Sequence, residues 1–395
     1  MISGSTSRNR VRLLTVALLF CLCGLAVGAR DAPADQRLGW SVAGGGWSAY
    51  QNVSTSPDTD SEAPALVIAE SRAVHLVWEE NDELFHSYQS HQTWSSPKRI
   101  RGTGNGEQPA LAAGSGGTVH LVYVNDSDVF YVAWDGSAWT IPQPVSQTEQ
   151  VSESPTIAVS GDGVIHVVAS ETAAKRLYHG FRSGSSSWTY VPITHEYGFA
   201  YGEGASIGVS PTNTVWLAFR DEDQEIYAMG YSGTAWSAPA LVSDSTETPS
   251  TAPDLAIDGT GSPHVVWQEE IDGVWQVRYA RGDNWSPPTT LSNSATGARL
   301  PAVATEGQEQ VHVAWQDESF PFAIRLTSRA GSENEWLQPS AVYSGTRALQ
   351  DVAISSGRLD GLHASWVEGS IGEILYAARR SHSIFLPLIS SSSSD

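Results

Sequence analysis

Cysteine is nearly absent from this 395-residue sequence, which contains two, and methionine is equally rare. Both cysteines, Cys21 and Cys23, lie within the first 29 residues, a segment that we expect to be removed. The remaining chain then has no thiol. It therefore cannot use thiolate catalysis, zinc–cysteine coordination or disulfide bonds, and its stability must come from a hydrophobic core.

Basic residues are also scarce: the sequence has 22 Lys and Arg but 43 Asp and Glu, which gives a formal net charge of −21. Removal of the leader takes three arginines with it, and the charge becomes −24. Such an excess argues against a nucleic-acid backbone or an anionic membrane surface as the main partner. The hydrophobic fraction of 41% is that of an ordinary folded protein.

Long apolar runs are missing except for the one from Leu13 to Val27, which follows Arg8, Arg10 and Arg12 and ends in small residues. This layout predicts a cleaved signal peptide over residues 1–29 and a secreted protein, extracellular or held at the cell surface. A membrane anchor is the alternative, but the run is short and a polar segment follows it. We expect no later membrane span, a lead-in over residues 30–45 and a tail over residues 381–395.

The sequence contains seven copies of one repeat. Apolar runs of the type His-Val-Val-Trp recur with a mean spacing of 48 residues, and a tryptophan recurs in parallel. The second positions of the apolar runs are His75, His120, His166, Trp216, His264, His312 and His363. The tryptophans are Trp47, Trp94, Trp139, Trp188, Trp236, Trp285 and Trp336.

Each unit contains four short strand signals with turn residues between them. The first begins at a proline, as in 64–68, 155–159 and 253–257, and the second is the His-Val-Val-Trp run. The third carries an aromatic residue and the fourth reads Trp-Ser-x-Pro. Seven such units predict an all-β, seven-bladed β-propeller of four-stranded antiparallel blades over residues 46–380, without long helices.

Two turns carry a family resemblance. Residues 135–139 and 232–236 read Asp-Gly-Ser-Ala-Trp and Ser-Gly-Thr-Ala-Trp. They resemble degenerate copies of the Asp-box, Ser-x-Asp-x-Gly-x-x-Trp, which sialidase-type propellers carry between the third and fourth strands. The resemblance implies the sialidase-like fold. It does not extend to the catalytic set, because the Arg-Ile-Pro signature is absent, and fold does not imply function.

The ring can be closed in two ways. Residues 46–50 look like a fourth strand without a preceding first three, and the last unit lacks a Trp-Ser fourth strand. We therefore expect the N-terminal segment to supply the outer strand of the last blade. The competing segment is Phe385–Ser390, which also aligns with the fourth strands.

Acidic residues gather in the loops that follow the second strands and in the segments that enter the first strands. These two sets share one predicted face and hold 27 of the 43 acidic residues. Exposed loops are normally charged, so solubility is one explanation. The other is a face that binds a ligand or attracts cations. Asp58, Asp60 and Glu62, and likewise Asp221 with Asp223, have the spacing of a weak calcium site.

The repeated histidines are expected to pack and to form hydrogen bonds within the fold, because a residue repeated in every unit usually does the same structural work in each. The aromatic residues that end the same strands are expected to pack between blades, with sugar stacking as the alternative. They are Trp78, Tyr123, Phe219, Trp267, Trp315 and Trp366.

The fourth unit breaks the pattern, and function often lies at such a break. Trp216 replaces its histidine, and the segment that enters it is long and aromatic. Candidate ligand-binding residues are Tyr197, Tyr201, Glu203, Arg220, Asp221, Arg299 and Arg347. Drift of one repeat is the alternative explanation.

Three functions remain open from the sequence. We expect a monomeric binding module for a carbohydrate or protein ligand. One alternative is a glycan-active enzyme, a sialidase-like glycoside hydrolase or a polysaccharide lyase, with Tyr201, Glu203 and Asp221 as catalytic candidates. The other is a structural extracellular scaffold. Calcium is the only cofactor that the sequence suggests.

Overall fold

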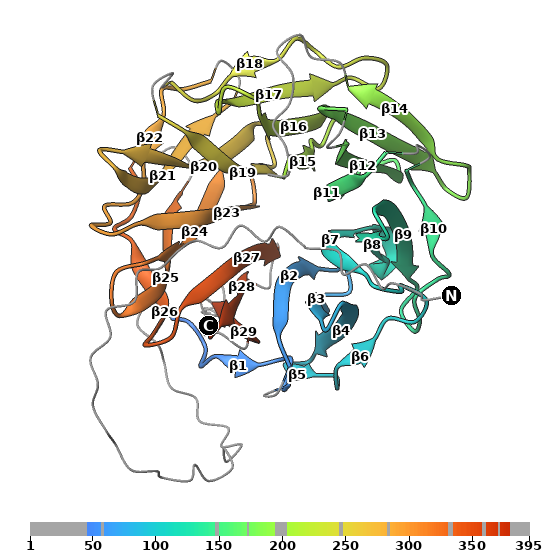
Figure 1. Ribbon diagram of the computed structural model, residues 1–395, viewed down its shortest axis with the longest axis horizontal. Helices are drawn as coiled ribbons and strands as arrows, with labels where there is room; N and C mark the ends of the chain where they lie inside the picture. The colour runs from blue at the N-terminus through green and yellow to red at the C-terminus, as the bar shows by residue number, and fades with distance from the viewer. Residues whose placement is uncertain are drawn as a thin grey trace, which may run out of the picture. The chain divides into compact units, whose positions relative to one another are not determined.

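The computed structural model of the protein describes residues 46–56, 59–146, 150–171, 174–193, 204–244, 248–282, 285–330, 335–357, 361–369 and 372–379. These residues form seven antiparallel sheets arranged in a ring around a central channel (Figure 1). A single three-residue 3₁₀ turn, η1 (Ser115–Gly117), is the only helical element among them. The prediction of an all-β propeller with seven blades is therefore confirmed.

The strands take the same place in every blade. The first strands, which line the channel, are β2 (Ser61–Ile68), β7 (Glu107–Ala113), β11 (Ser152–Val159), β15 (Ser206–Val209), β19 (Ser250–Ile257), β23 (Ala298–Glu306) and β27 (Leu349–Gly357). The second strands are β3 (Val74–Glu80), β8 (Val119–Asn125), β12 (Val164–Glu171), β16 (Val215–Arg220), β20 (Pro263–Ile271), β24 (Gln310–Asp317) and β28 (Gly361–Glu368).

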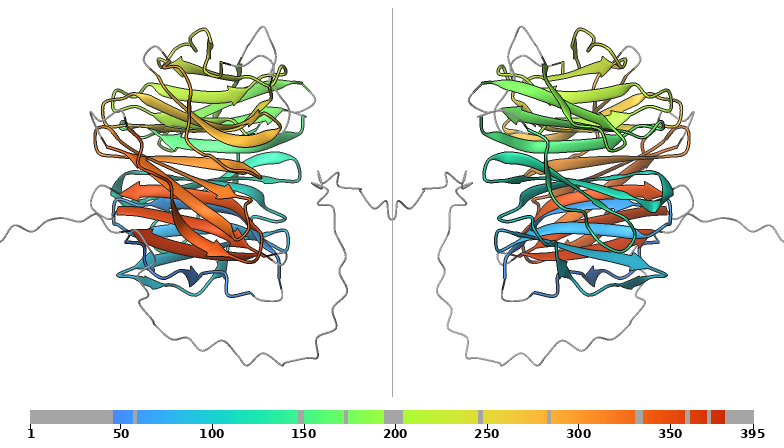
Figure 2. Two further views of the ribbon diagram at one scale, coloured as in Figure 1. Left: turned by 90° about the vertical axis from the view of Figure 1, so that its left-hand side faces the viewer. Right: turned by 90° about the vertical axis from the view of Figure 1, so that its right-hand side faces the viewer.

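The third strands lie farther out, and the fourth strands form the rim. The third strands are β4 (Glu83–Ser90), β9 (Asp128–Trp134), β13 (Arg176–Ser183), β17 (Ile226–Tyr231), β21 (Val274–Arg281), β25 (Phe322–Arg329) and β29 (Glu373–Arg379). The outer strands are β5 (Thr93–Trp94) with β6 (Lys98–Arg99), β10 (Gln143–Pro144), β14 (Thr189–Ile193), β18 (Ala240–Leu241), β22 (Thr289–Thr290), β26 (Ser340–Gly345) and β1 (Gln51–Asn52). From the side, neighbouring sheets lie face to face (Figure 2).

Six of the seven first strands, all except β15, carry a β-bulge near the position where the sequence suggested that the strand begins. In β2, β11 and β19 the strand therefore begins three residues before its proline. In β2 the pairing register shifts between Glu62 and Ala65, and Ala63 has φ 50°. Five other blades repeat the bulge with a left-handed residue: Gln108, Ser154, Ala252, Leu300 and Asp351. Proline follows in most of them and has no N–H to place in the ladder, so the bulge absorbs the missing hydrogen bond.

The repeated histidines hold the second and third strands together, as predicted. His120 Nδ1 lies 2.6 Å from Tyr131 Oη, and His264 Nδ1 lies 2.7 Å from Tyr279 Oη. In blade 1 the partner is another histidine, with His75 Nδ1 3.0 Å from His86 Nε2. Burial lowers the pKa of His75 to about 4, so this pair is neutral at physiological pH.

The aromatic residues at the ends of the second strands form the contacts between blades, as predicted. Trp78 is fully buried against Val367 and Ile374 of blade 7, and Trp315 packs on Val266 of blade 5. Each such cluster joins a blade to the one before it. Full burial of a large apolar side chain contributes roughly 3 kcal/mol, so these contacts stabilise the packing of neighbouring blades.

The two Asp-box-like segments form the predicted turns between third and fourth strands. Asp135 Oδ1 accepts hydrogen bonds from the backbone N–H groups of Ser137 (2.8 Å) and Ala138 (2.9 Å). Gly136 and Gly233 occupy the same place in their turns with φ near 100°, a conformation that favours glycine.

The N-terminal strand pairs with the last blade. In β1, Gln51 lies opposite Tyr376 of β29, and Trp47 forms an isolated bridge with Arg379. Ser48 N donates to Ala378 O at 2.8 Å. The competing segment Phe385–Ser390 lies outside the described residues, so the identity of the closing strand stays a prediction.

The signal peptide (1–29), the lead-in (30–45) and the tail (381–395) lie outside the described residues. Within the described part of the chain, no helix is long and apolar enough to cross a membrane.

Candidate functional site

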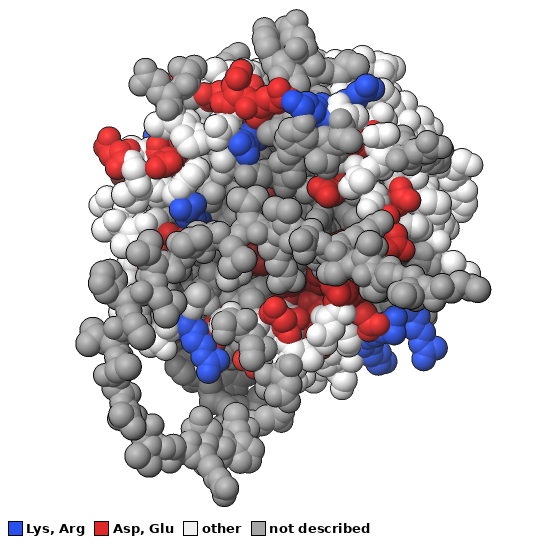
Figure 3. All heavy atoms as spheres, viewed as in Figure 1, with Lys and Arg blue, Asp and Glu red and all other residues white. Residues whose placement is uncertain are grey.

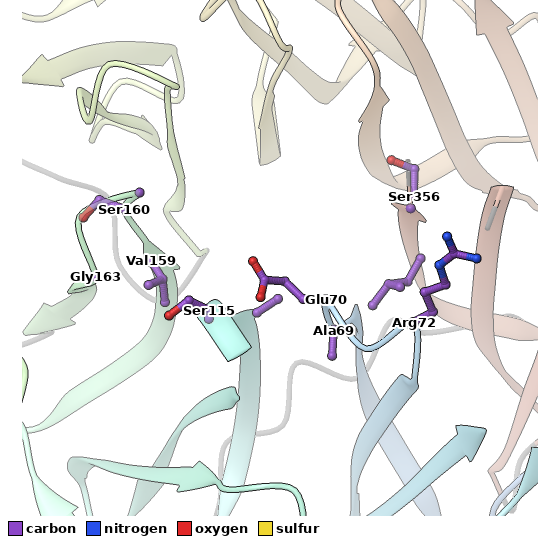
Figure 4. A pocket seen from close by; sticks show the side chains of 13 residues that line it. Ala69, Glu70, Arg72, Ser115, Val159, Ser160, Gly163 and Ser356 are labelled. Atoms are coloured by element: carbon purple, nitrogen blue, oxygen red, sulfur yellow. The ribbon is translucent and has the colours of Figure 1, made fainter. Parts of the chain in front are cut away.

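The ring has two sides, which carry different connections between the strands. We call the side with the turns between first and second strands, such as 69–73, the turn face. We call the side with the loops between second and third strands, such as 81–82, the loop face. The sequence pointed to the loop face for a ligand, but a pocket of about 460 Å³ opens on the turn face. We call it the channel pocket (Figure 4).

The channel pocket is built from the turns of blades 1, 2, 3 and 7. Glu70 and Arg72 leave the same turn and point to opposite sides, Glu70 toward Ser115 and Arg72 toward Ser356 (Figure 4). Ser160 of blade 3 completes the polar rim. The apolar lining comes from the ends of the first strands: Ile68, Ala69, Ala113 and Val159.

Backbone geometry fixes the acidic side of the pocket. Glu70 Oε2 accepts a hydrogen bond of 2.7 Å from Gly116 N. Gly116 has φ 66° within η1, a left-handed conformation that glycine adopts without strain. Arg72 also has a left-handed φ, of 65°, which turns its side chain away from Glu70. The pocket thus holds a carboxylate and a guanidinium apart, with serine hydroxyls beside each.

This pocket suits a polar ligand without a strong net charge. The carboxylate accepts hydrogen bonds and the guanidinium donates them. Ser160 Oγ and Ser356 Oγ already donate to Asp162 Oδ1 and to Thr305 O, so toward a ligand they act as acceptors. Its volume lies within the usual range of small-molecule sites.

A second cavity of about 370 Å³ lies farther along the channel, at the level of the bulges. Asp254 there accepts hydrogen bonds from Ser206 Oγ of blade 4 (2.9 Å) and Val303 N of blade 6 (2.8 Å). Burial raises the pKa of Asp254 and likewise that of Asp351, which also lines this cavity. Because Asp254 ties three consecutive blades together, we assign it to the architecture.

On the loop face, part of the acidic excess is structural. One polar residue per blade stands two positions after the place of the second-strand aromatic, and most of these residues are buried. They are Glu80, Asn125, Glu171, Asp221, Glu269, Asp317 and Glu368. A repeated acid at this spacing is a signal that sequence reasoning could have used.

Glu80 shows what this position does. Its carboxylate accepts hydrogen bonds from Ser56 Oγ (2.9 Å), Thr59 Oγ1 (3.0 Å), Ser61 Oγ (3.1 Å) and Trp78 Nε1 (3.1 Å). Three of these donors lie in the segment that enters blade 1. The carboxylate therefore anchors that segment to the end of the second strand.

The same anchor recurs in other blades. Asn125 Oδ1 accepts from Asn105 N at 3.1 Å, and Asp317 Oδ1 accepts from Ser294 Oγ at 3.2 Å. The remaining acidic residues give the surface its charge, and acidic side chains cover more of the face seen in Figure 3 than basic ones do.

The density of acid on the loop face perturbs Glu79. Burial, together with the charges of Glu62 and Glu107, raises the pKa of Glu79 from 4.5 to about 7. The folded state therefore binds a proton more tightly than the unfolded state between these values. Stability due to this group falls as the pH rises from about 4.5 to 7, and the full cost of ionisation is present above pH 7.

We expect Glu79→Gln to stabilise the protein by about 2 kcal/mol at pH 8 and to change little near pH 4.5. Glutamine keeps the acceptor that Gln108 N uses and removes the charge. Urea unfolding of both proteins at the two pH values measures the difference. A gain that is the same at both pH values contradicts the assignment.

The predicted blade-four site lies largely outside the described residues, as Tyr197, Tyr201 and Glu203 all do. Arg220 is half-buried at the end of β16. Asp221 is 1% exposed, and its Oδ1 accepts from Glu225 N at 2.9 Å. Asp221 thus stands in the anchor position of its blade, as Glu80 does in blade 1.

The other two predicted arginines do not belong to blade four: Arg299 lies in blade 6, and Arg347 precedes the first strand of blade 7. Arg299 of β23 pairs with Glu318 at 3.0 Å and stacks over Trp275 at 4.8 Å. Arg347 is exposed in the segment that enters blade 7.

The predicted calcium ligands are only partly described, since Asp58 lies outside. Asp60 Oδ1 accepts from Gly372 N at 2.9 Å, Glu62 begins the bulge of β2, and Asp223 is exposed. Among the described residues, no three or more His, Cys, Asp or Glu side chains gather closely enough to hold a metal. Calcium binding stays a prediction.

Sequence reasoning missed the channel pocket. One signal was available: the turn at 69–73 carries both an acidic and a basic residue. The matching turns of blades 2 to 5 carry glycine, serine, threonine, proline, asparagine and at most one acid.

No protein-family model and no curated protein matches the chain. Solved structures do. An ulvan lyase from a new family of polysaccharide lyases, bound to -[GlcA(1-4)Rha3S]-, has TM-score 0.62 and 12% identity, covering 82% of this chain and 95% of its own. A protein of unknown function from Dyadobacter fermentans has TM-score 0.52 and 11% identity, covering 85% and 100%.

The fucose-specific lectin of Aleuria aurantia has TM-score 0.50 and 14% identity, covering 73% of this chain and 96% of its own. At such low identity these likenesses establish the fold alone: the chain is a β-propeller whose structural neighbours include a polysaccharide lyase and a lectin.

Proposed function

We propose that the chain is a secreted carbohydrate-binding propeller and that its channel pocket binds a neutral sugar. One observation carries the proposal: Glu70, Arg72 and three serines line one open pocket of about 460 Å³. Sugar hydroxyls donate and accept hydrogen bonds at once, and this mixture of an anion, a cation and hydroxyls satisfies both roles. The lyase and lectin neighbours support a glycan as the ligand class.

A glycan array probed with the secreted chain tests the proposal, and calorimetry then measures the dissociation constant of a bound glycan. We expect Glu70→Gln to weaken that binding about tenfold, because a charged acceptor is lost while the hydrogen bond from Gly116 N is kept. If the protein binds no glycan on the array, the proposal is contradicted.

Glu309→Gln is the matched control. Glu309 lies in the corresponding turn of blade 6 and does not line the pocket. We expect its dissociation constant to stay within about twofold of the natural value, since no contact is lost. Equal weakening by both variants indicates a general charge effect and contradicts the channel pocket as the site.

A glycan-active enzyme is the alternative, with the predicted blade-four residues at its centre. Assays on a panel of chromogenic glycosides and uronate polymers detect hydrolysis or elimination. If an activity is found and Tyr201→Phe, Glu203→Gln and Asp221→Asn each leave it intact, the blade-four site is wrong. The two turns that resemble degenerate Asp-boxes support a sialidase-type fold, which is part of this alternative.

A further inference from the structure

A third cavity, of about 420 Å³, lies between blades 2 and 3, away from the channel. We call it the interblade pocket. It is lined by the third strand of each blade and the turns that follow: Tyr131, Ala133, Thr140, Gln143, Arg182, Ser185, Ser186, Ser187 and Trp188. Arg182 is the only charged residue in this lining.

Arg182 is held in place by aromatic rings. Its guanidinium carbon lies 4.4 Å from the ring centre of Tyr131 and 4.8 Å from that of Trp188. The two rings meet edge to face at 5.4 Å. Arg182 Nη1 donates to Gln143 Oε1. The guanidinium group of Arg182 is thus oriented before any ligand binds, which lowers the conformational entropy that is lost on binding.

In the described part of the chain, no carboxylate pairs with this cation. Among the described residues, Arg182 forms no ion pair within 4.0 Å, and its Nε is buried without a hydrogen-bond partner. A half-buried, oriented guanidinium without a counter-charge is suited to a ligand oxyanion, which it can bind through two parallel hydrogen bonds.

The repeat supplies an internal comparison. Arg329 stands at the same register in blade 6, opposite the residue before the repeated histidine, and stacks over Tyr279 and Trp336. The carboxylate of that cluster, Asp258, lies 3.1 Å from His264 Nε2 and 3.8 Å from Arg281 Nη2, and Arg329 Nε is buried without a hydrogen-bond partner, as Arg182 Nε is. In blade 2 the position of Asp258 is taken by Gly114.

The glycine in blade 2 cannot be replaced by a larger residue without a clash. A Cβ on Gly114 would lie 2.3 Å from His120 Nε2. Among the described residues, the cluster between blades 2 and 3 has one arginine and no carboxylate, whereas the cluster between blades 5 and 6 has two arginines, Arg281 and Arg329, and one carboxylate, Asp258. Each cluster thus keeps one uncompensated positive charge.

We propose that the interblade pocket binds the carboxylate of an acidic sugar, a hexuronate, with Arg182 as the ligand of the carboxylate. The serines at 185–187 and Thr140 provide the hydroxyl and amide partners that sugar hydroxyl groups need. The pocket lies on the turn side of blades 2 and 3, so the acidic loops do not line it. The inference does not depend on the channel pocket.

Two probes that differ in one group test the proposal. Methyl β-glucuronide carries a carboxylate where methyl β-glucoside carries a hydroxymethyl group, and NMR titration of the secreted chain measures both. We expect the glucuronide to bind with a millimolar or lower dissociation constant and the glucoside at least about tenfold more weakly, because only the former pairs with arginine.

Arg182→Gln should weaken glucuronide binding about tenfold or more, and Arg182→Lys should weaken it by a smaller factor, since lysine keeps the charge but not the planar fork. The control Arg329→Gln should leave the dissociation constant within twofold. Circular dichroism verifies that each variant is folded. If Arg182→Gln does not fold, Arg182→Lys becomes the test variant.

Equal binding of glucuronide and glucoside overturns the proposal, and so does glucuronide binding that survives Arg182→Gln. Inorganic sulfate that competes as strongly as the glucuronide overturns the assignment to a carboxylate. Loss of glucuronide binding in Glu70→Gln would place the ligand in the channel pocket instead, so a failure here is distinguishable from a failure of the proposed function.

Discussion

Removal of residues 30–53 will lower the melting temperature of the protein by about 7 °C or more. The deleted segment contains Trp47 and Val53, which are 1% and 3% exposed. Trp47 packs into the core of blades 6 and 7, and Val53 packs between blades 7 and 1. Loss of a buried tryptophan, a buried valine and the pairing of β1 costs roughly 5 kcal/mol or more.

Calorimetric scans of the natural and shortened chains measure this effect. A shorter deletion, of residues 30–44, is the control, because it leaves Trp47 and everything after it in place. We expect that control to melt within about 2 °C of the natural chain. An unchanged melting temperature after the full deletion would show that Phe385–Ser390, and not the N-terminal segment, closes the ring.

Glu80→Ala is the second large effect, with an expected loss of about 3 kcal/mol in the free energy of unfolding. The substitution leaves four hydrogen-bond donors without their acceptor. Trp78 and Ser61 are fully buried, so water cannot replace the carboxylate for these two donors. Urea unfolding at pH 7 measures the difference.

Glu80→Gln and Glu83→Ala serve as controls. Glutamine keeps one acceptor oxygen, so we expect a loss of about 1 kcal/mol. Glu83 forms a partly exposed ion pair with Arg99 at 2.9 Å, and its removal should cost less than about 0.5 kcal/mol. If Glu80→Ala costs no more than Glu83→Ala, the anchor role of Glu80 is wrong.

The fold was predictable because the sequence contains seven copies of the same four-strand repeat. A period near 48 residues and two independent markers fix the number of blades, and the turns between strands follow from glycine, aspartate and serine. The bulges were not predictable, since the proline at position 64 marks the irregularity but says nothing of the left-handed Ala63 before it. Local backbone strain of this kind depends on the partner strand.

The site was harder to predict for a physical reason. Charge density in sequence does not distinguish a buried anchor from an exposed ligand, so Glu80 and Asp221 were counted with the exposed acids. The channel pocket joins turns that are almost 290 residues apart in the chain, at Glu70 and Ser356, and only the closed ring brings them together. Arg182 was not predictable as a site residue because two of its partners, Tyr131 and Gln143, come from the preceding blade.

The pairing of β1 with β29 has a consequence for how the protein folds. Ala378 N donates to Ser48 Oγ across a sequence separation of 330 residues. Six blades can form from local contacts as the chain is synthesised, but the ring stays an open arc with two apolar flanks until the last blade arrives. We therefore expect closure to be the slow, long-range step of folding, and the open arc that precedes it to be the state most exposed to aggregation.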